Sequence, residues 1–147
     1  MNDNTNCELP DSNPPSDEIR TLLTASKVIA IVGLSDKPDR ASNRVAVYLK
    51  AHGYKIIPVN PMKDEILGDK CYPTLSDIQE PVDIVDIFRK VDMIPAIVDE
   101  AIKISAKAVW MQLGLAHHES AEKARQAGLI VVQSKCTKIE HENMQQS

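Results

Sequence analysis

Short, largely apolar segments alternate with amphipathic stretches along most of the chain. The first segment, KVIAIVGL at residues 27–34, carries no polar side chain after its lysine, which is typical of a strand buried on both faces of a sheet. Similar segments follow at residues 54–60, 82–88, 106–112 and 129–133. The pattern therefore predicts five strands.

The stretches between these segments carry apolar residues at helical spacing. After the first strand, Val45 and Leu49 lie on one helical face, Ser42 stands where an N-cap residue belongs, and Gly53 provides the stop. Further helices are predicted at residues 93–105 and 119–128, with a short one starting near Thr74 and another capped by Ser16.

The alternation of strands and helices predicts an α/β fold: a Rossmann-like, doubly wound, mainly parallel five-stranded sheet with helices on both faces. Pro58 predicts that the second strand lies at an edge or at a point without a ladder bond. Such sheets bind ligands beyond the carboxyl ends of their strands, so we expect the site in loops 33–44, 60–63, 88–92 and 112–118.

The length of 147 residues is enough for one domain with a real core. Residues 1–15 are rich in Asn, Asp and Pro and are predicted to be a flexible tail. The domain itself is predicted to span residues 16–141, with a frayed C-terminus at 142–147.

Composition narrows the possible partners. With 26% charged residues, a net charge of −4 and a pI of 5.5, the chain has no basic excess for nucleic acid. No apolar run approaches the ~20 residues that span a bilayer, and the N-terminus does not resemble a secretory signal. Cys7, Cys71 and Cys136 are too few for a disulfide framework, which favours reduced thiols and a cytoplasmic protein.

The turn after the first strand lacks two of the three glycines of a dinucleotide-binding turn. Gly33 fills the first position, while Ser35 and Pro38 occupy the other two. An acidic residue that would hold the ribose of NAD is also missing, because the second strand ends at residues 59–61 in Val, Asn and Pro. Both features argue against NAD.

The polar loop that replaces the glycines leads into the helix expected at Ser42. Amide groups and the dipole at a helix start favour an anion, and Lys37, Arg40 and Arg44 could add charge-assisted bonds. The alternative is that the charges of residues 36–40 form only a solvated surface loop.

The segment VGLSDKPDRASNRVAVYLKAHGYKIIPVNP resembles the opening of the small stand-alone CoA-binding proteins. Their domain is similar to the CoA-binding domain in the alpha subunit of succinyl-CoA synthetase and in related acyl-CoA synthetases. The resemblance continues through VDIVDIFRK, AVWMQLG and CTKIEH, and covers about residues 25–141. It implies a Rossmann-like fold and a coenzyme A ligand.

The resemblance also implies which residues bind coenzyme A, with Asn60 placed to contact a ribose or base edge. Leu34 and Ala41 stand where we expect Ala and Pro in relatives, and Thr137 stands where we expect Pro. The implied residues are Gly33, Leu34, Ser35, Lys37, Arg40 and Ser42 for the phosphates, Val59, Asn60 and Pro61 for adenosine, and Phe88, Arg89, Gln112, Leu113 and Gly114 after the third and fourth strands.

No catalytic or metal-binding residue is predicted. His117 and His118 are adjacent, so they project differently and complete no ligand set. Asp83 and Asp86 point to opposite faces of a strand, which favours structural roles. Cys136 leaves two alternatives: a mixed disulfide with the CoA thiol, or an inert buried thiol.

The function predicted from the sequence is non-catalytic binding of coenzyme A or acyl-CoA. No nucleic-acid or membrane partner is predicted, and no protein partner is indicated. Two alternatives remain: an NAD(P)-binding redox protein on the same fold, and an accessory CoA-binding subunit of an acyl-CoA synthetase.

Overall fold

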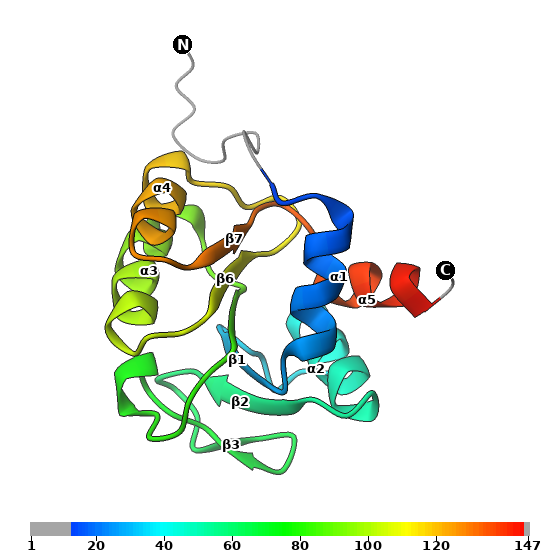
Figure 1. Cartoon of the computed structure of the whole chain (residues 1–147). Coiled ribbons are helices and arrows are strands. Elements are labelled where there is room, and N and C mark those ends of the chain that lie inside the picture. Colours follow the sequence, from blue (N-terminus) through cyan, green and yellow to red (C-terminus); the bar gives the residue numbers. More distant parts are fainter. Residues whose placement is uncertain (1–12, 146–147) are drawn as a thin grey trace.

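A parallel five-stranded sheet forms the centre of the molecule, for which a computed structural model describes residues 13–145 (Figure 1). The strand order is β2-β1-β5-β6-β7, and each neighbouring pair is parallel. The predicted Rossmann-like α/β fold is confirmed. The strands are β1 (Val28–Val32), β2 (Lys55–Val59), β5 (Ile84–Ile87), β6 (Ala108–Met111) and β7 (Ile130–Val132).

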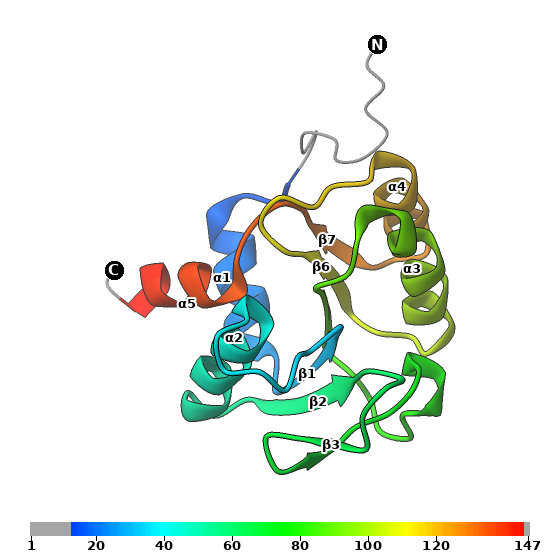
Figure 2. The ribbon, with the colours of Figure 1, turned by 180° about the vertical axis from the view of Figure 1, so that it is seen from behind.

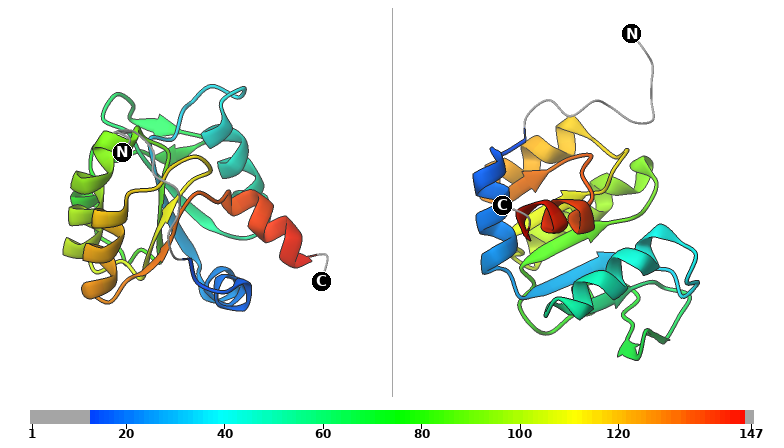
Figure 3. Two further views of the ribbon diagram at one scale, coloured as in Figure 1. Left: turned by 90° about the horizontal axis from the view of Figure 1, so that it is seen from above. Right: turned by 90° about the vertical axis from the view of Figure 1, so that its right-hand side faces the viewer.

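Helices cover both faces of the sheet, as the alternating pattern predicts (Figure 3, left). Helices α3 (Ile94–Lys103) and α4 (His118–Gln126) pack on one face. The other face carries α1 (Ser16–Ala25), α2 (Ala41–Ala51) and α5 (Thr137–Gln145). The sheet is thus buried between two helical layers.

Alternation along β1 shows why the strands are apolar throughout. Ile29 and Ile31 point toward the layer of α1 and α2, whereas Ala30 and Val32 point toward α3 and α4. Both faces of a parallel strand therefore need apolar side chains. Pro58 lies in β2, which is an edge strand of the sheet, as predicted.

The chain between β2 and β5 folds as an irregular lobe below the sheet (Figure 2). It holds a small hairpin that the pattern did not predict, made of β3 (Glu65–Ile66) and β4 (Asp69–Lys70). The predicted short helix is present as η1 (Leu75–Asp77). A second short helix, η2 (Val91–Met93), leads into α3.

Hydrogen bonds and helical structure continue close to both ends of the described residues. The side chain of Asn13 pairs with Gln133 beyond β7, and α5 includes residues 142–145, where the sequence predicts fraying. The N-cap residue of α1 is Pro15 rather than Ser16. The remainder of the predicted tail, residues 1–12, lies outside the described residues. No helix within residues 13–145 has the length and apolar character needed to cross a membrane.

Candidate functional site

The strand order reverses between β1 and β5, which creates a crevice at the carboxyl edge of the sheet. From β1 the chain proceeds to β2 on one side, and from β5 it proceeds to β6 and β7 on the other. Open α/β sheets bind ligands at this switch point. Gly33 follows β1 and Arg89 follows β5, so both lie beside the crevice.

Gly33 permits a close approach between these two strand ends. Its φ is +90°, and a Cβ atom there would lie 2.6 Å from both the carbonyl oxygen of Phe88 and Cδ of Arg89. Any side chain would therefore strain the backbone and push Arg89 away. The sequence predicted the turn, and the structure adds the contact with the end of β5.

Ser35 is held by the first turn of α2. The Ser35 amide donates to Oγ of Ser42 (3.0 Å), and the Ser35 carbonyl accepts from Nδ2 of Asn43 (2.9 Å). The predicted N-cap role of Ser42 is wrong, because Arg40 is the N-cap residue and Ser42 lies inside the helix. The Ser42 hydroxyl anchors the phosphate-binding loop predicted from the sequence instead.

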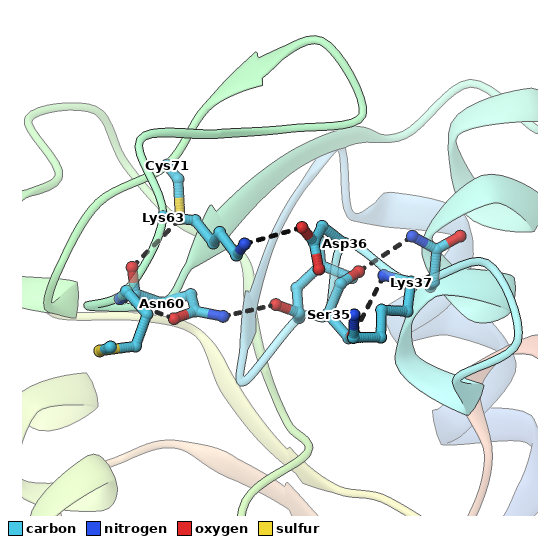
Figure 4. A network of polar contacts seen from close by, with 9 residues as sticks. Ser35, Asp36, Lys37, Asn60, Lys63 and Cys71 are labelled. Carbon is cyan, nitrogen blue, oxygen red and sulfur yellow. Dashed lines mark hydrogen bonds and ion pairs between the residues drawn. The ribbon is translucent and has the colours of Figure 1, made fainter.

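Asn60 joins the loop after β2 to the loop after β1 (Figure 4). Its Nδ2 donates to the carbonyl of Leu34 (3.0 Å), and its Oδ1 accepts from the amide of Met62 (2.8 Å). The Cys71 thiol donates to the Asn60 carbonyl (3.4 Å). The side chain expected at a ribose or base edge is thus engaged within the chain itself.

An ion pair between Asp36 and Lys63 joins the same two loops, with its charged atoms 2.9 Å apart (Figure 4). The hydrogen bond from Lys63 lowers the pKa of the Asp36 carboxyl, and nearby Lys37 adds to the effect. An exposed pair contributes little to stability. The pair links the loop that carries Lys37 and Arg40 to the loop after β2.

Two cavities open at the crevice, and Arg89 lines both. The larger has a volume of about 620 Å³ and lies between the start of α2, the ends of β5 and β6, and the start of α5. The smaller, of about 290 Å³, lies between the ends of β1 and β2 and helix α3. Besides Arg89, the larger is lined by Ala41, Arg44, Val45, Phe88, Lys90, Gln112, Leu113, Leu115, Cys136, Lys138 and Ile139, and the smaller by Val32, Val59, Pro61, Pro73, Thr74, Met93, Ala96, Ile97 and Glu100.

The wall of the larger cavity combines apolar side chains with positive charge. Arg44, Arg89, Lys90 and Lys138 are its charged residues, and no carboxylate stands among its described lining residues. Such a wall favours a ligand with both an anionic group and apolar atoms.

A network of three polar side chains lies behind this wall. Asp86 is fully buried; its Oδ1 accepts from Nε2 of Gln112 (2.6 Å) and its Oδ2 accepts from the hydroxyl of Thr137 (3.0 Å). Nε2 of Gln112 also donates to Oγ1 of Thr137 (3.0 Å). Burial raises the pKa of Asp86 to about 7, against the two hydrogen bonds that lower it.

Asp83 lies at the opposite edge of the sheet from the crevice. Its Oδ2 accepts from the amides of Lys27 (2.8 Å) and Val28 (2.9 Å). Burial raises the pKa of Asp83, but these bonds and nearby Lys107 outweigh it, so the pKa is lowered overall. The structural role predicted for Asp83 is confirmed, and it forms no acid–base pair with Asp86.

Cys71, Cys136 and His117 lie in different parts of the fold. Cys136 is half-buried in the wall of the larger cavity, Cys71 is buried, which raises the pKa of its thiol, and Cys7 lies outside the described residues. His117 is the N-cap residue of α4, where its side chain accepts from the amide of Ser120. Within the described part of the chain, no three His, Cys, Asp or Glu side chains are grouped to hold a metal.

The structure brings together part of the residue set predicted from the sequence. Phe88, Arg89, Gln112 and Leu113 line the larger cavity, and Val59 and Pro61 line the smaller. Leu34 is fully buried in the core. Lys37, Arg40 and Gly114 are exposed and line neither cavity.

Sequence reasoning missed the side chains that α5 and the segment just before η1 contribute. Lys138 and Ile139 line the larger cavity from α5, and Pro73 and Thr74 line the smaller. The motif CTKIEH contains the first two, but its residues carry no pattern that places them at the crevice.

The fold and the crevice define a Rossmann-like α/β domain with its binding edge at a single switch point. More particularly, the chain belongs to the CoA-binding domain family, whose model matches residues 27–142. The family resemblance expected from the sequence is confirmed.

Three relatives illustrate the range of this family. The chain is 41% identical over 129 residues to the uncharacterized protein YneT of Bacillus subtilis, covering 88% of this chain and 96% of that one. It superposes on a hypothetical protein from Pyrococcus horikoshii with a TM-score of 0.87, at 42% identity over 93% of this chain and 99% of that chain. It is also 30% identical over 120 residues to the ADP-forming acetate–CoA ligase I of Archaeoglobus fulgidus, covering 75% of this chain but only 18% of that enzyme.

Proposed function

We propose that the protein binds coenzyme A or an acyl-CoA across the crevice, without catalysis of its own. The observation that carries this proposal is the placement of Arg89, beside Gly33 and between two cavities. Coenzyme A has the same order of parts, since its pyrophosphate lies between adenosine and the pantetheine arm. The smaller cavity would hold adenosine and the larger one the arm.

The charges at the crevice support the position of the phosphates. Arg89 and Arg44 line the larger cavity, and the start of α2 adds free amides and the positive end of its dipole. Arg guanidinium groups bind phosphate with two parallel hydrogen bonds. Lys37 and Arg40, on the loop held by Asp36, are available for the 3′-phosphate or for the pyrophosphate.

The end of β2 supports coenzyme A over NAD. A dinucleotide site holds the ribose with a carboxylate at this strand end, where this chain has Val59, Asn60 and Pro61. Glu100 lines the smaller cavity, but its carboxylate accepts from the Leu75 amide and the Ser76 hydroxyl. Glu100 is the one carboxylate among the described residues that line this cavity, so an NAD(P)-binding function lacks a free carboxylate there to hold the ribose.

An accessory role in an acyl-CoA synthetase is a second candidate, and the similarity to an acetate–CoA ligase favours it. Co-purification with an ATP-binding subunit would support this role. For either function we place the protein in the cytoplasm, because Cys71 and Cys136 are free thiols.

Calorimetric titration of the purified protein with CoA, acetyl-CoA and NAD tests the proposal. We expect CoA and acetyl-CoA to bind and to raise the melting temperature, and NAD to do so far less. Equal binding of NAD would contradict the ligand assignment.

Arg89→Ala tests the position of the phosphates. Loss of a charge-assisted bond should weaken CoA binding about tenfold to a hundredfold. The matched control is Arg125→Ala, because Arg125 lies on α4 and pairs with Glu122, away from the crevice. If both variants bind CoA as tightly as the wild type, the phosphates do not lie beside Arg89.

A further inference from the structure

The side-chain amide of Gln112 has its two ends in different surroundings. Gln112 follows β6 and is only 5% exposed. Its Nε2 donates to Oδ1 of Asp86 (2.6 Å) and to Oγ1 of Thr137 (3.0 Å). A carboxamide nitrogen carries two hydrogens, so both are used inside the protein.

The other two members of the network fix which way this amide points. The Thr137 hydroxyl donates its single hydrogen to Oδ2 of Asp86 (3.0 Å) and so can only accept from Gln112. Above the pKa of Asp86, about 7, its carboxylate is ionised and is likewise only an acceptor. Both groups therefore face the amide nitrogen of Gln112, and turning the amide would bring its oxygen against Asp86.

The carbonyl oxygen of Gln112 is left facing the larger cavity. Within the described part of the chain, this oxygen accepts no hydrogen bond. Every fully buried side-chain oxygen of the described residues does have a hydrogen-bond partner. The oxygen is therefore not sealed in the core, and the cavity is the opening that Gln112 lines. Among the described residues of that wall, Gln112 is the one with a side-chain oxygen.

We propose that Gln112 is a fixed hydrogen-bond acceptor for an amide N–H of the pantetheine arm, and that Asp86 and Thr137 are positioning residues that hold it. This inference rests on the proposed function and deepens it. The charged side chains of the wall are cationic donors, which suit phosphate and carbonyl oxygens but not an N–H group.

The strand order favours an amide over the hydroxyl of the arm. Gly33 follows β1, whereas Gln112 follows β6, two strands away across β5. Neighbouring strands are about 4.8 Å apart, so Gln112 is roughly 10 Å from the turn at which we place the pyrophosphate. The hydroxyl lies close to the pyrophosphate along the arm, and both amides lie beyond it.

Calorimetry with three ligands at pH 8, above the pKa of Asp86, tests the proposal. The ligands are CoA and two analogues, each with one pantetheine N–H replaced by an ester oxygen. We expect the wild type to bind one analogue about threefold to tenfold more weakly than CoA, since one hydrogen bond is lost. Equal affinity for all three ligands would overturn the proposal.

Three variants separate the acceptor from its supports. Gln112→Met keeps the side-chain length and removes the acceptor, so it should bind CoA and the sensitive analogue equally. Asp86→Asn can face the Gln112 amide with either an oxygen or a nitrogen, so the preference for CoA should shrink. Thr137→Ser keeps the hydroxyl and is the conservative control, with the preference retained.

The outcomes are distinguishable from a failure of the proposed function. If the wild type binds no CoA, the proposed function fails and this inference fails with it. If CoA binds but Gln112→Met keeps the wild-type preference, the acceptor assignment alone is wrong. If Asp86→Asn keeps the wild-type preference for CoA over the analogue, the positioning role of Asp86 is wrong. Should Gln112→Met not fold, the wild-type comparison of the three ligands still decides.

Discussion

A side chain at Gly33 would cost stability in two ways, through backbone strain at positive φ and through a clash with neighbouring atoms. Gly128 serves as a control, because only the backbone strain applies there. Gly33 and Gly128 have φ values of +90° and +94°, but a Cβ atom on Gly128 would meet nothing within 4 Å. Gly128→Ala should therefore cost only the backbone strain, about 1–2 kcal/mol. Gly33→Ala should cost about 1–3 kcal/mol more, because it also pushes against Phe88 and Arg89.

Urea unfolding of both variants, together with CoA titration, checks this expectation. CoA affinity should fall in Gly33→Ala, since Arg89 is displaced, and stay at the wild-type level in Gly128→Ala. Equal destabilisation by the two changes would show that the approach of β5 to Gly33 is not energetically important.

Arg40 tests whether the exposed loop takes part in binding. Arg40→Ala should weaken CoA binding about tenfold to a hundredfold if its guanidinium bonds a phosphate, with little change in stability because the side chain is exposed. Titration with dephospho-CoA assigns the phosphate: a loss confined to CoA indicates the 3′-phosphate. Wild-type affinity of the variant for both ligands would favour the solvated-loop alternative.

Asp86 should make stability depend on pH in a particular direction. Its pKa is raised from 3.8 to about 7, so between these values the folded protein holds a proton that the unfolded chain releases. The free energy of unfolding should therefore fall as pH rises from about 4 to about 7, by a contribution on the order of 4 kcal/mol. Urea unfolding across this range should show that Asp86→Asn loses this contribution. An identical pH profile in the variant would contradict it.

The role of a residue could be predicted from the sequence where its side chain suits one structural role, and not where it suits several. The need for Gly33 follows from its place after a strand. Ser42 has the chemistry of an N-cap, but its hydroxyl bonds the Ser35 amide, and Asn60 bonds its own loops rather than facing a ligand. These choices depend on three-dimensional neighbours that the local pattern does not contain.

Among the elements, the strands were predictable from apolar runs, but α5 was not. Its buried residues are Thr137 and His141, both polar, so the segment carries no apolar stripe. Tertiary contacts stabilise it instead: His141 Nδ1 lies 2.7 Å from the Tyr48 hydroxyl, and Thr137 bonds Asp86. The hairpin of β3 and β4 was missed for a different reason, because two-residue strands are too short to show alternation.

Tyr48 offers a test of how α5 is held. Tyr48→Phe removes the hydroxyl that bonds His141 and should cost about 1 kcal/mol. Burial, and then His52, lower the pKa of His141, so this bond is made by a neutral imidazole at neutral pH. Hydrogen exchange should show faster exchange in α5 of the variant.

Tyr72→Phe is the matched control, since the Tyr72 hydroxyl makes no hydrogen bond to the described residues. Its cost should stay within about 0.5 kcal/mol. If the two variants are equally stable, the contact between α2 and α5 does not depend on the Tyr48 hydroxyl.

For the molecule as a whole, we expect no nucleotide-dependent formation of acyl-CoA by the purified 147-residue chain. The similarity to the acetate–CoA ligase covers 18% of that enzyme, and the chain contains no Gly-rich Lys-Ser/Thr phosphate loop. Incubation with acetate, CoA and ATP or GTP, followed by mass spectrometry of the thioester, checks this. Detection of acetyl-CoA above a protein-free control would refute it.

The side chain of Asn13 pairs with the backbone just beyond β7, at one edge of the sheet. Its side-chain amide donates to the Gln133 carbonyl (2.9 Å) and accepts from the Gln133 amide (2.8 Å), as a neighbouring strand would. Unpaired edges invite strand addition from other molecules and hence aggregation. At one edge, β7 is only three residues long, and the backbone groups of the following Gln133 are already bonded to Asn13. At the other edge, Tyr72 forms a bridge with Val59 of β2. Each edge of the sheet is thus partly closed to strand addition, and less of its backbone is open as a template for self-association.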